Sequence, residues 1–256
     1  MDVAKMEGRT VETSPQFYAR LAGACYLLGA LASVFGQLII PDKVVVSSSA
    51  ATTAANILAH ESLYRFSAVL AFVSVPFHLV WAILFYRLFR PVNRSIPLLA
   101  AFVMLLGCVM WTLSAFFSLA VLNVLKGTSS LSAFGPEQLQ TLALVLLRLN
   151  VQAYDVGLMF FGLWCLLVGY LIAKSTFLPR LIGVLYALAG VGYLTLLWQP
   201  LAKYLYPYNL ALAGPGEASL LLWLVAKGVN VPKWKEQAIA LTKGFSGPRE
   251  GVRSTS

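Results

Sequence analysis

Long apolar segments separated by short polar turns dominate the chain, and they predict helices that cross a membrane. An α-helix rises about 1.5 Å per residue, so roughly 20 apolar residues cross the hydrocarbon core. The pattern therefore predicts an all-α, polytopic transmembrane helix bundle with six spans. The predicted spans are residues 18–40, 63–89, 96–125, 137–173, 179–198 and a last one that ends before Lys227.

The sixth segment is less regular than the other five. Only Ala218 to Ala226 is cleanly apolar, and Gly214-Pro215-Gly216 precedes it. Glycine and proline weaken a helix interior, so we expect a short span that is broken at this tripeptide. Broken helices at mid-membrane often line substrate cavities, which makes this span the first place to look for a function.

Polar segments flank the apolar region at both ends. We expect residues 1–17 to be a cytoplasmic N-terminal segment, residues 18–230 the transmembrane domain, and residues 231–256 a basic, disordered cytoplasmic tail. Ala30-Leu31-Ala32 resembles a signal-peptidase site, which leaves cleavage open as an alternative. The apolar stretch continues to Ile40, however, and therefore reaches the length of a span.

Lysine and arginine are distributed unevenly between the two ends of the predicted helices. Fourteen of the 19 lie before or early in the first span, in the turns at 87–94 and 174–180, or from Lys227 onward. Cytoplasmic loops carry an excess of these residues. The sequence therefore predicts that both termini are cytoplasmic.

The composition agrees with this interpretation. Of the 256 residues, 59% are hydrophobic and 11% are charged, against about 25% charged in ordinary soluble domains. A net charge of +9 would suggest a nucleic-acid partner in a soluble protein. Here the basic turns account for the charge, so we expect the lipid bilayer and no nucleic acid as a partner.

No pattern of metal, cofactor or catalytic residues is present. The three cysteines lie in separate apolar segments, which is unlike a disulfide framework or a zinc motif. His60 and His78 are about 27 Å apart along one helix, which is too far for both to hold a haem. Neither a glycine-rich phosphate loop nor a GxSxG motif occurs. We therefore predict no metal, no cofactor and no catalytic residue.

Three stretches of the sequence resemble elements of a known family. They are Glu61-Ser62-Leu63-Tyr64-Arg65, Leu88 to Arg94, and Gly157 through Tyr193. Together they resemble the bacterial membrane proteins of domain-of-unknown-function family 4386, over roughly residues 17–230. The resemblance implies a multi-helix protein of a bacterial plasma (inner) membrane, without an established activity and without catalytic residues to transfer.

Two ionisable residues are predicted to lie near the middle of the bilayer, where such groups are costly and often functional. His78 precedes Arg87 by nine residues, which corresponds to a depth of about 13 Å. Glu217 precedes Lys227 by ten residues, which corresponds to about 15 Å. Their similar depth predicts a shared cavity.

Each of these two residues also has a purely structural interpretation. Pro76 frees a backbone carbonyl one turn before it, so His78 could simply bond that carbonyl or Ser74. Glu217 could lie at the N-terminus of a short helix, where its charge suits the helix dipole.

A second polar cluster is predicted toward the opposite, outward face. Glu61 and Arg65 are spaced as a favourable helix pair. Their depth also allows pairing of Arg65 with Asp155 and of Glu61 with Arg148. Such a cluster is either a clamp between helices or a ligand site, and we favour the clamp. Its candidate members are Gln37, Glu61, Tyr64, Arg65, Arg148, Gln152, Tyr154 and Asp155.

These residues lead to a functional hypothesis with two alternatives. We expect a protein that binds a small molecule or lipid in an outward-facing polar cavity, as a carrier, sensor or accessory protein. One alternative is an intramembrane enzyme that uses His78 and Glu217 as acid and base; the absence of a catalytic motif argues against it. The other is a structural partner of a membrane complex.

Overall fold

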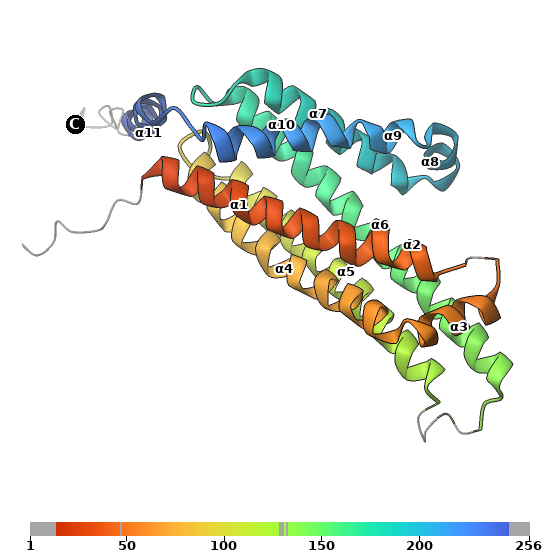
Figure 1. The fold of residues 1–256 in the computed structure, drawn as a ribbon. Helices are drawn as coiled ribbons and strands as arrows, with labels where there is room; N and C mark the ends of the chain where they lie inside the picture. The colour runs from red at the N-terminus through yellow and green to blue at the C-terminus, as the bar shows by residue number, and fades with distance from the viewer. Residues whose placement is uncertain (1–13, 47, 128–130, 132, 246–256) are drawn as a thin grey trace, which may run out of the picture.

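The computed structural model describes residues 14–46, 48–127, 131 and 133–245 (Figure 1). Most of the predicted N-terminal segment and residues 246–256 of the predicted tail therefore lie outside the described residues. Within the described ranges the secondary structure is helical and no strand occurs, which confirms the all-α prediction. The helices are α1 (Pro15–Ser33), η2 (Val34–Ile39), α2 (Ile40–Val44), α3 (Ala50–Ala59), α4 (Glu61–Phe89), α5 (Ile96–Leu125), α6 (Pro136–Lys174), α7 (Arg180–Leu194), η4 (Thr195–Leu197), α8 (Gln199–Leu205), α9 (Tyr208–Ala211), α10 (Ala213–Ala226) and α11 (Val231–Phe245).

Six helical segments of the described chain are long and apolar enough to cross a membrane, as the sequence predicts. The first span combines α1, η2 and α2, and the fifth combines α7 and η4. The last combines α9 and α10. The six segments are Pro15–Val44, Glu61–Phe89, Ile96–Leu125, Pro136–Lys174, Arg180–Leu197 and Tyr208–Ala226.

The spans pack as a closed ring. Along the chain, α1 packs on α4, α4 on α5, α5 on α6, α6 on α7 and α7 on α10, and α10 returns to α1. The side chain of Gln16 joins the two ends of this ring: Nε2 donates to the carbonyl of Lys227 at 2.8 Å, and Oε1 accepts from the backbone N–H of Val229 at 2.9 Å. The start of the first span and the end of the last therefore lie at the same end of the bundle (Figure 1).

Two separate hydrophobic cores fill the bundle. The larger core lies inside the ring and is rich in aromatic residues; Tyr26 stacks on Trp81 with ring centroids 4.1 Å apart, and Trp81 contacts Trp164 edge-on. The smaller core includes Val44, Ile57 and residues of α4, α5 and α6. It lies at the end of the bundle where α2 and α3 are found, away from α11 (Figure 1).

Glycines allow a close approach of two helix backbones at the contact of α6 with α7. A Cβ atom added to Gly183 would lie 2.6 Å from the carbonyl oxygen of Gly169, and one added to Gly169 would lie 2.6 Å from that of Gly183. Gly162 and Gly190 form a similar pair about two helical turns further along. Small residues permit such backbone contacts in lipid, where packing rather than water exclusion holds helices together.

The break expected at Gly214-Pro215-Gly216 is not found there. The tripeptide lies in the first turns of α10, which is continuous from Ala213 to Ala226. Proline is tolerated at this position because its missing N–H would have no helical partner in the first turn. The interruption falls earlier, at Leu212, between α9 and α10.

Two further helices differ from the sequence analysis. The Ser-, Thr- and Ala-rich segment 43–59, expected to be a loop between the first two spans, contains α3. Ser49 caps this helix, because its hydroxyl accepts the N–H of Thr52 at 3.2 Å. Residues 231–245 of the predicted disordered tail form α11. Trp234 attaches α11 to the bundle, because its Nε1 donates to the carbonyl of Leu88 at 2.8 Å.

Candidate functional site

A cavity of about 240 Å³ lies within the ring, and we call it the central cavity. Each of the six spans contributes at least one residue to its wall, so the whole ring must assemble before the cavity exists. Most of the wall is apolar or aromatic. The lining residues are Tyr26, Ala30, Ser33, Val34, Leu38, His78, Trp111, Tyr154, Leu158, Phe161, Tyr193, Leu210 and Glu217.

Two tyrosines hold the carboxylate of Glu217 in this cavity. The hydroxyl of Tyr26, from α1, donates to Oε2 at 2.5 Å, and the hydroxyl of Tyr193, from α7, donates to Oε1. A carboxylate has about four acceptor positions, so two hydrogen bonds leave further lone pairs for another donor. The glutamate is therefore fixed in orientation and still able to accept a hydrogen bond.

His78 has one nitrogen committed to the backbone. Its Nδ1 lies 2.8 Å from the carbonyl oxygen of Ser74. A carbonyl can only accept, so Nδ1 carries the proton, and in the neutral ring Nε2 is an acceptor. The bond to Ser74 agrees with the structural interpretation of this histidine, yet the ring also lines the central cavity, where it packs edge-on against Trp111 at 4.9 Å between centroids.

A second cavity of about 410 Å³ lies toward the end of the bundle that carries α2 and α3, and we call it the end chamber. Gln37, Tyr64 and Asn150 are among its lining residues. The amide nitrogen of Asn150 donates to the carbonyl of Ser114 at 2.7 Å and that of Gln37 donates to the Ser114 hydroxyl at 3.1 Å, so three helices share one polar network.

A π-helical segment, η2, separates the two cavities. Its wider turns bond each N–H to a carbonyl five residues back, as in the bond from Ile40 to Phe35. Val34 lines the central cavity, Gln37 lines the end chamber, and Leu38 lines both. Single π-helical turns inside α-helices frequently occur at functional sites.

The residues predicted from the sequence divide into three groups. His78, Tyr154 and Glu217 line the central cavity. Gln37 and Tyr64 line the end chamber, where the buried hydroxyl of Tyr64 lies near Ser118 without a regular hydrogen bond. The remaining candidates line neither cavity: Glu61, Arg65, Arg148, Gln152 and Asp155.

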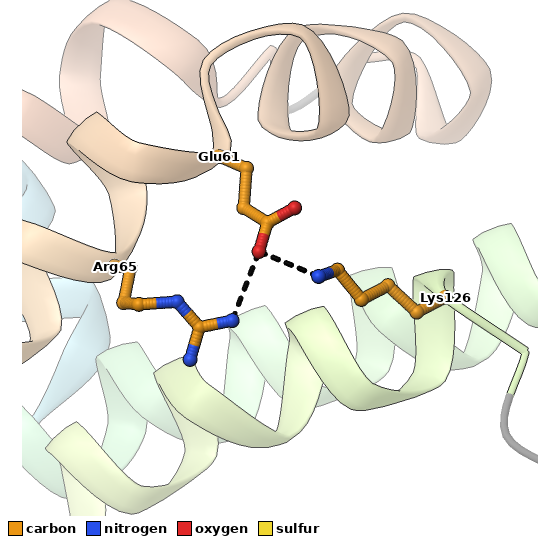
Figure 2. Close-up of polar contacts among 3 residues, drawn as sticks. All are labelled: Glu61, Arg65 and Lys126. Atoms are coloured by element: carbon orange, nitrogen blue, oxygen red, sulfur yellow. Dashed lines mark hydrogen bonds and ion pairs between the residues drawn. The ribbon is translucent and has the colours of Figure 1, made fainter.

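Glu61 forms an ion-pair cluster on the surface (Figure 2). Its Oε1 lies 2.9 Å from Arg65 and 2.6 Å from Lys126, the residue that follows α5. Lys126 thus takes the place that the sequence analysis gave to Arg148. The three side chains are between 31% and 52% exposed, and such pairs contribute about 0–1 kcal/mol each. The cluster is a weak clamp between α4 and α5.

Sequence reasoning missed the two tyrosines that bind Glu217. Tyr26 and Tyr193 stand in apolar segments, where their rings suggest packing alone. Their hydroxyl groups could have indicated a polar site, because a tyrosine deep in a span needs a hydrogen-bond partner. In the part of the chain that the structure describes, no three His, Cys, Asp or Glu side chains gather as a metal site requires.

A ring of six apolar helices around a largely aromatic cavity with a few polar groups defines a polytopic membrane protein. The sequence matches the family described as "Domain of unknown function (DUF4386)" over residues 21–228, and the chain belongs to that family. This agrees with the resemblance seen in the sequence.

One relative extends the comparison to the archaea. An uncharacterized protein of Archaeoglobus fulgidus is 27% identical over 165 residues, which cover 64% of this chain and 84% of the relative. No solved structure matches the chain. Neither the family description nor this relative carries a stated activity.

Proposed function

We propose that the protein binds a small organic molecule with a hydrogen-bond-donating, preferably cationic, head in the central cavity, as a membrane carrier or sensor. The observation that carries this proposal is the carboxylate of Glu217, held by two tyrosines in a cavity to which all six spans contribute. An ionisable group at membrane depth is costly and usually has a function.

Glu217 and His78 favour a hydrogen-bond donor as ligand. A carboxylate can only accept hydrogen bonds, and the neutral ring of His78 offers an acceptor at Nε2. Five aromatic rings contribute to the wall, and aromatic faces attract organic cations. They belong to Tyr26, Trp111, Tyr154, Phe161 and Tyr193. A primary or secondary amine with a short apolar body combines both features.

The volume limits the size of this ligand. At about 240 Å³ the central cavity is smaller than the roughly 300–1,000 Å³ of drug-sized sites. A longer apolar tail would have to pass Leu38 into the end chamber. Two cavities in series along the bundle suit a carrier, because a ligand can be handed from one to the other.

Acid–base catalysis is the second candidate, and one observation favours it. His78 and Glu217 line the same cavity, as an enzyme using both would require. The two candidates differ in what happens to the ligand, since a carrier or sensor releases it unchanged.

The ligand class can be tested by thermal unfolding of the purified protein in detergent. We expect small lipophilic amines to raise the melting temperature, whereas carboxylic acids of the same size and neutral amides do not. A ligand at 100 times its Kd stabilises by about 2.7 kcal/mol. The variant E217Q should lose the amine effect, and E61Q, which removes a carboxylate outside both cavities, should retain it.

Two outcomes would count against this proposal. Amines that fail to stabilise the wild type would exclude the ligand class, and amines that stabilise E217Q equally would exclude Glu217 as the acceptor. Mass spectrometry of the recovered amine separates the two candidate functions, because an altered amine would indicate catalysis.

We also propose that both termini face the cytoplasm, and that the membrane is a bacterial plasma membrane. The basic turns at 87–94 and 174–180 lie at the same end as α11, and Lys and Arg are sparse at the other. Alkaline phosphatase, which is active only outside the cytoplasm, should be active when inserted in the segment 43–59 and inactive in the turn 174–180. The opposite pattern would invert the topology.

A further inference from the structure

A large groove opens beside α11, at the end of the ring where α4 ends. Its volume is about 620 Å³, and none of the described residues that line it is acidic. Three arginines contribute to it from the last turn of α4 and the turn that follows: Arg87, Arg90 and Arg94. We call it the basic groove. It is separate from the central cavity and shares no residue with it.

Two of these arginines, Arg87 and Arg90, are available for an anion. Arg87 and Arg90 are exposed, and among the described residues neither forms an ion pair with a carboxylate. The guanidinium of Arg87 lies 5.7 Å from the ring centroid of Tyr18, which limits the directions in which it can point. The planar guanidinium donates two parallel hydrogen bonds to a phosphate group.

The opposite wall of the groove is largely apolar. Trp234, Ala238 and Leu241 are spaced four and three residues apart, so they share one face of α11. The bond from Trp234 to the carbonyl of Leu88 fixes this face against the end of the second span. An amphipathic helix with a tryptophan in this position is typical of the membrane–water interface.

We propose that the basic groove binds an anionic phospholipid of the surrounding bilayer, with its headgroup phosphate on Arg87 and Arg90 and an acyl chain along α11. A free phosphate ion would use the arginines alone and leave the apolar wall without a partner. The groove lies at the end of the second span, at the depth where the headgroups of the surrounding lipids lie. This site is independent of any ligand in the central cavity.

The test compares lipids on the intact protein in detergent. Titration with short-chain phosphatidylglycerol is expected to raise the melting temperature and to leave bound lipid in native mass spectra. Phosphatidylcholine of the same chain length and inorganic phosphate should do neither. In the variant R87Q/R90Q we expect the apparent affinity for phosphatidylglycerol to fall at least about tenfold, which corresponds to about 1.4 kcal/mol.

Matched variants make the result decisive. R148Q/K203Q removes the same charge from residues outside the groove and should bind the lipid as the wild type does. R87K/R90K keeps the charge but not the planar fork, and should bind with intermediate affinity. An equal loss of phosphatidylglycerol affinity in R148Q/K203Q would show that the lipid responds only to the net charge of the protein. Stabilisation by inorganic phosphate alone would exclude the lipid as the ligand. Either result overturns the proposal, as does equal binding of the two lipids.

Discussion

The substitution Gly183→Leu is expected to prevent folded protein from accumulating in the membrane. A Cβ atom at this position would meet the carbonyl of Gly169 at 2.6 Å and the backbone N of Ala173 at 2.8 Å. Both neighbours are backbone atoms and cannot rotate away, so α7 would have to separate from α6. Overpacking of a core costs about 1–3 kcal/mol, and a clash with backbone exceeds this range. Proteins are stable by only about 5–15 kcal/mol.

Gly214→Leu is the matched control for this prediction. Gly214 lies at the start of α10, and a Cβ atom there would have no described neighbour within 4 Å. Size-exclusion chromatography of both variants in mild detergent provides the measurement. We expect a monodisperse peak for Gly214→Leu and aggregation or loss for Gly183→Leu. A Gly183→Leu protein that elutes and melts like the wild type would disprove the close contact of α6 with α7.

The substitution Glu217→Leu is expected to destabilise the ring by about 2–6 kcal/mol, since it leaves two hydroxyl groups in the cavity without their acceptor. These are the hydroxyls of Tyr26 and Tyr193, and an unsatisfied buried polar group costs about 1–3 kcal/mol. Because Tyr26 is on α1 and Tyr193 is on α7, the substitution removes the hydrogen bonds that join both helices to α10, which closes the ring. Glu217→Gln should cost less, because its amide retains a carbonyl oxygen.

A double-mutant comparison isolates this interaction. In a Y26F/Y193F background there are no hydroxyls to satisfy, so Glu217→Leu should be far less destabilising there than in the wild type. Equilibrium unfolding in detergent, or the melting temperature, gives both differences. If Glu217→Leu has the same effect in both backgrounds, the two tyrosines do not contribute through the carboxylate.

The spans were predictable because local patterns define them. The third predicted span has the observed bounds of α5, Ile96–Leu125, since a basic turn precedes the apolar segment and Lys126 follows it. The helix α3 was not predictable in this way. The segment 43–59 is rich in Ser, Thr and Ala, a composition that suggests a loop, and the helix depends on the cap at Ser49 and on burial of Ile57 in the smaller core.

The sequence predicted how deep the candidate residues lie in the bilayer, but not toward which neighbouring helix their side chains point. Counting residues from the basic turns gave His78 and Glu217 a common depth, and the structure has both in one cavity; their role in binding stays a prediction. The rotation of a helix about its axis cannot be read from a sequence that is apolar on every face. For this reason the sequence did not predict Tyr26 and Tyr193 as hydrogen-bond donors to Glu217, or Lys126 as the partner of Glu61.

The length of α6 allows one end of the bundle to unfold locally without the other. With 39 residues the helix is about 58 Å long, well beyond the roughly 40–45 Å of a whole bilayer. Residues near its start pack in the smaller core and those of its second half in the larger one. Elements held by separate cores unfold as separate cooperative units. The smaller core can therefore open by local unfolding of α3 and the start of α6, while amide protons in the helices of the larger core remain protected from exchange.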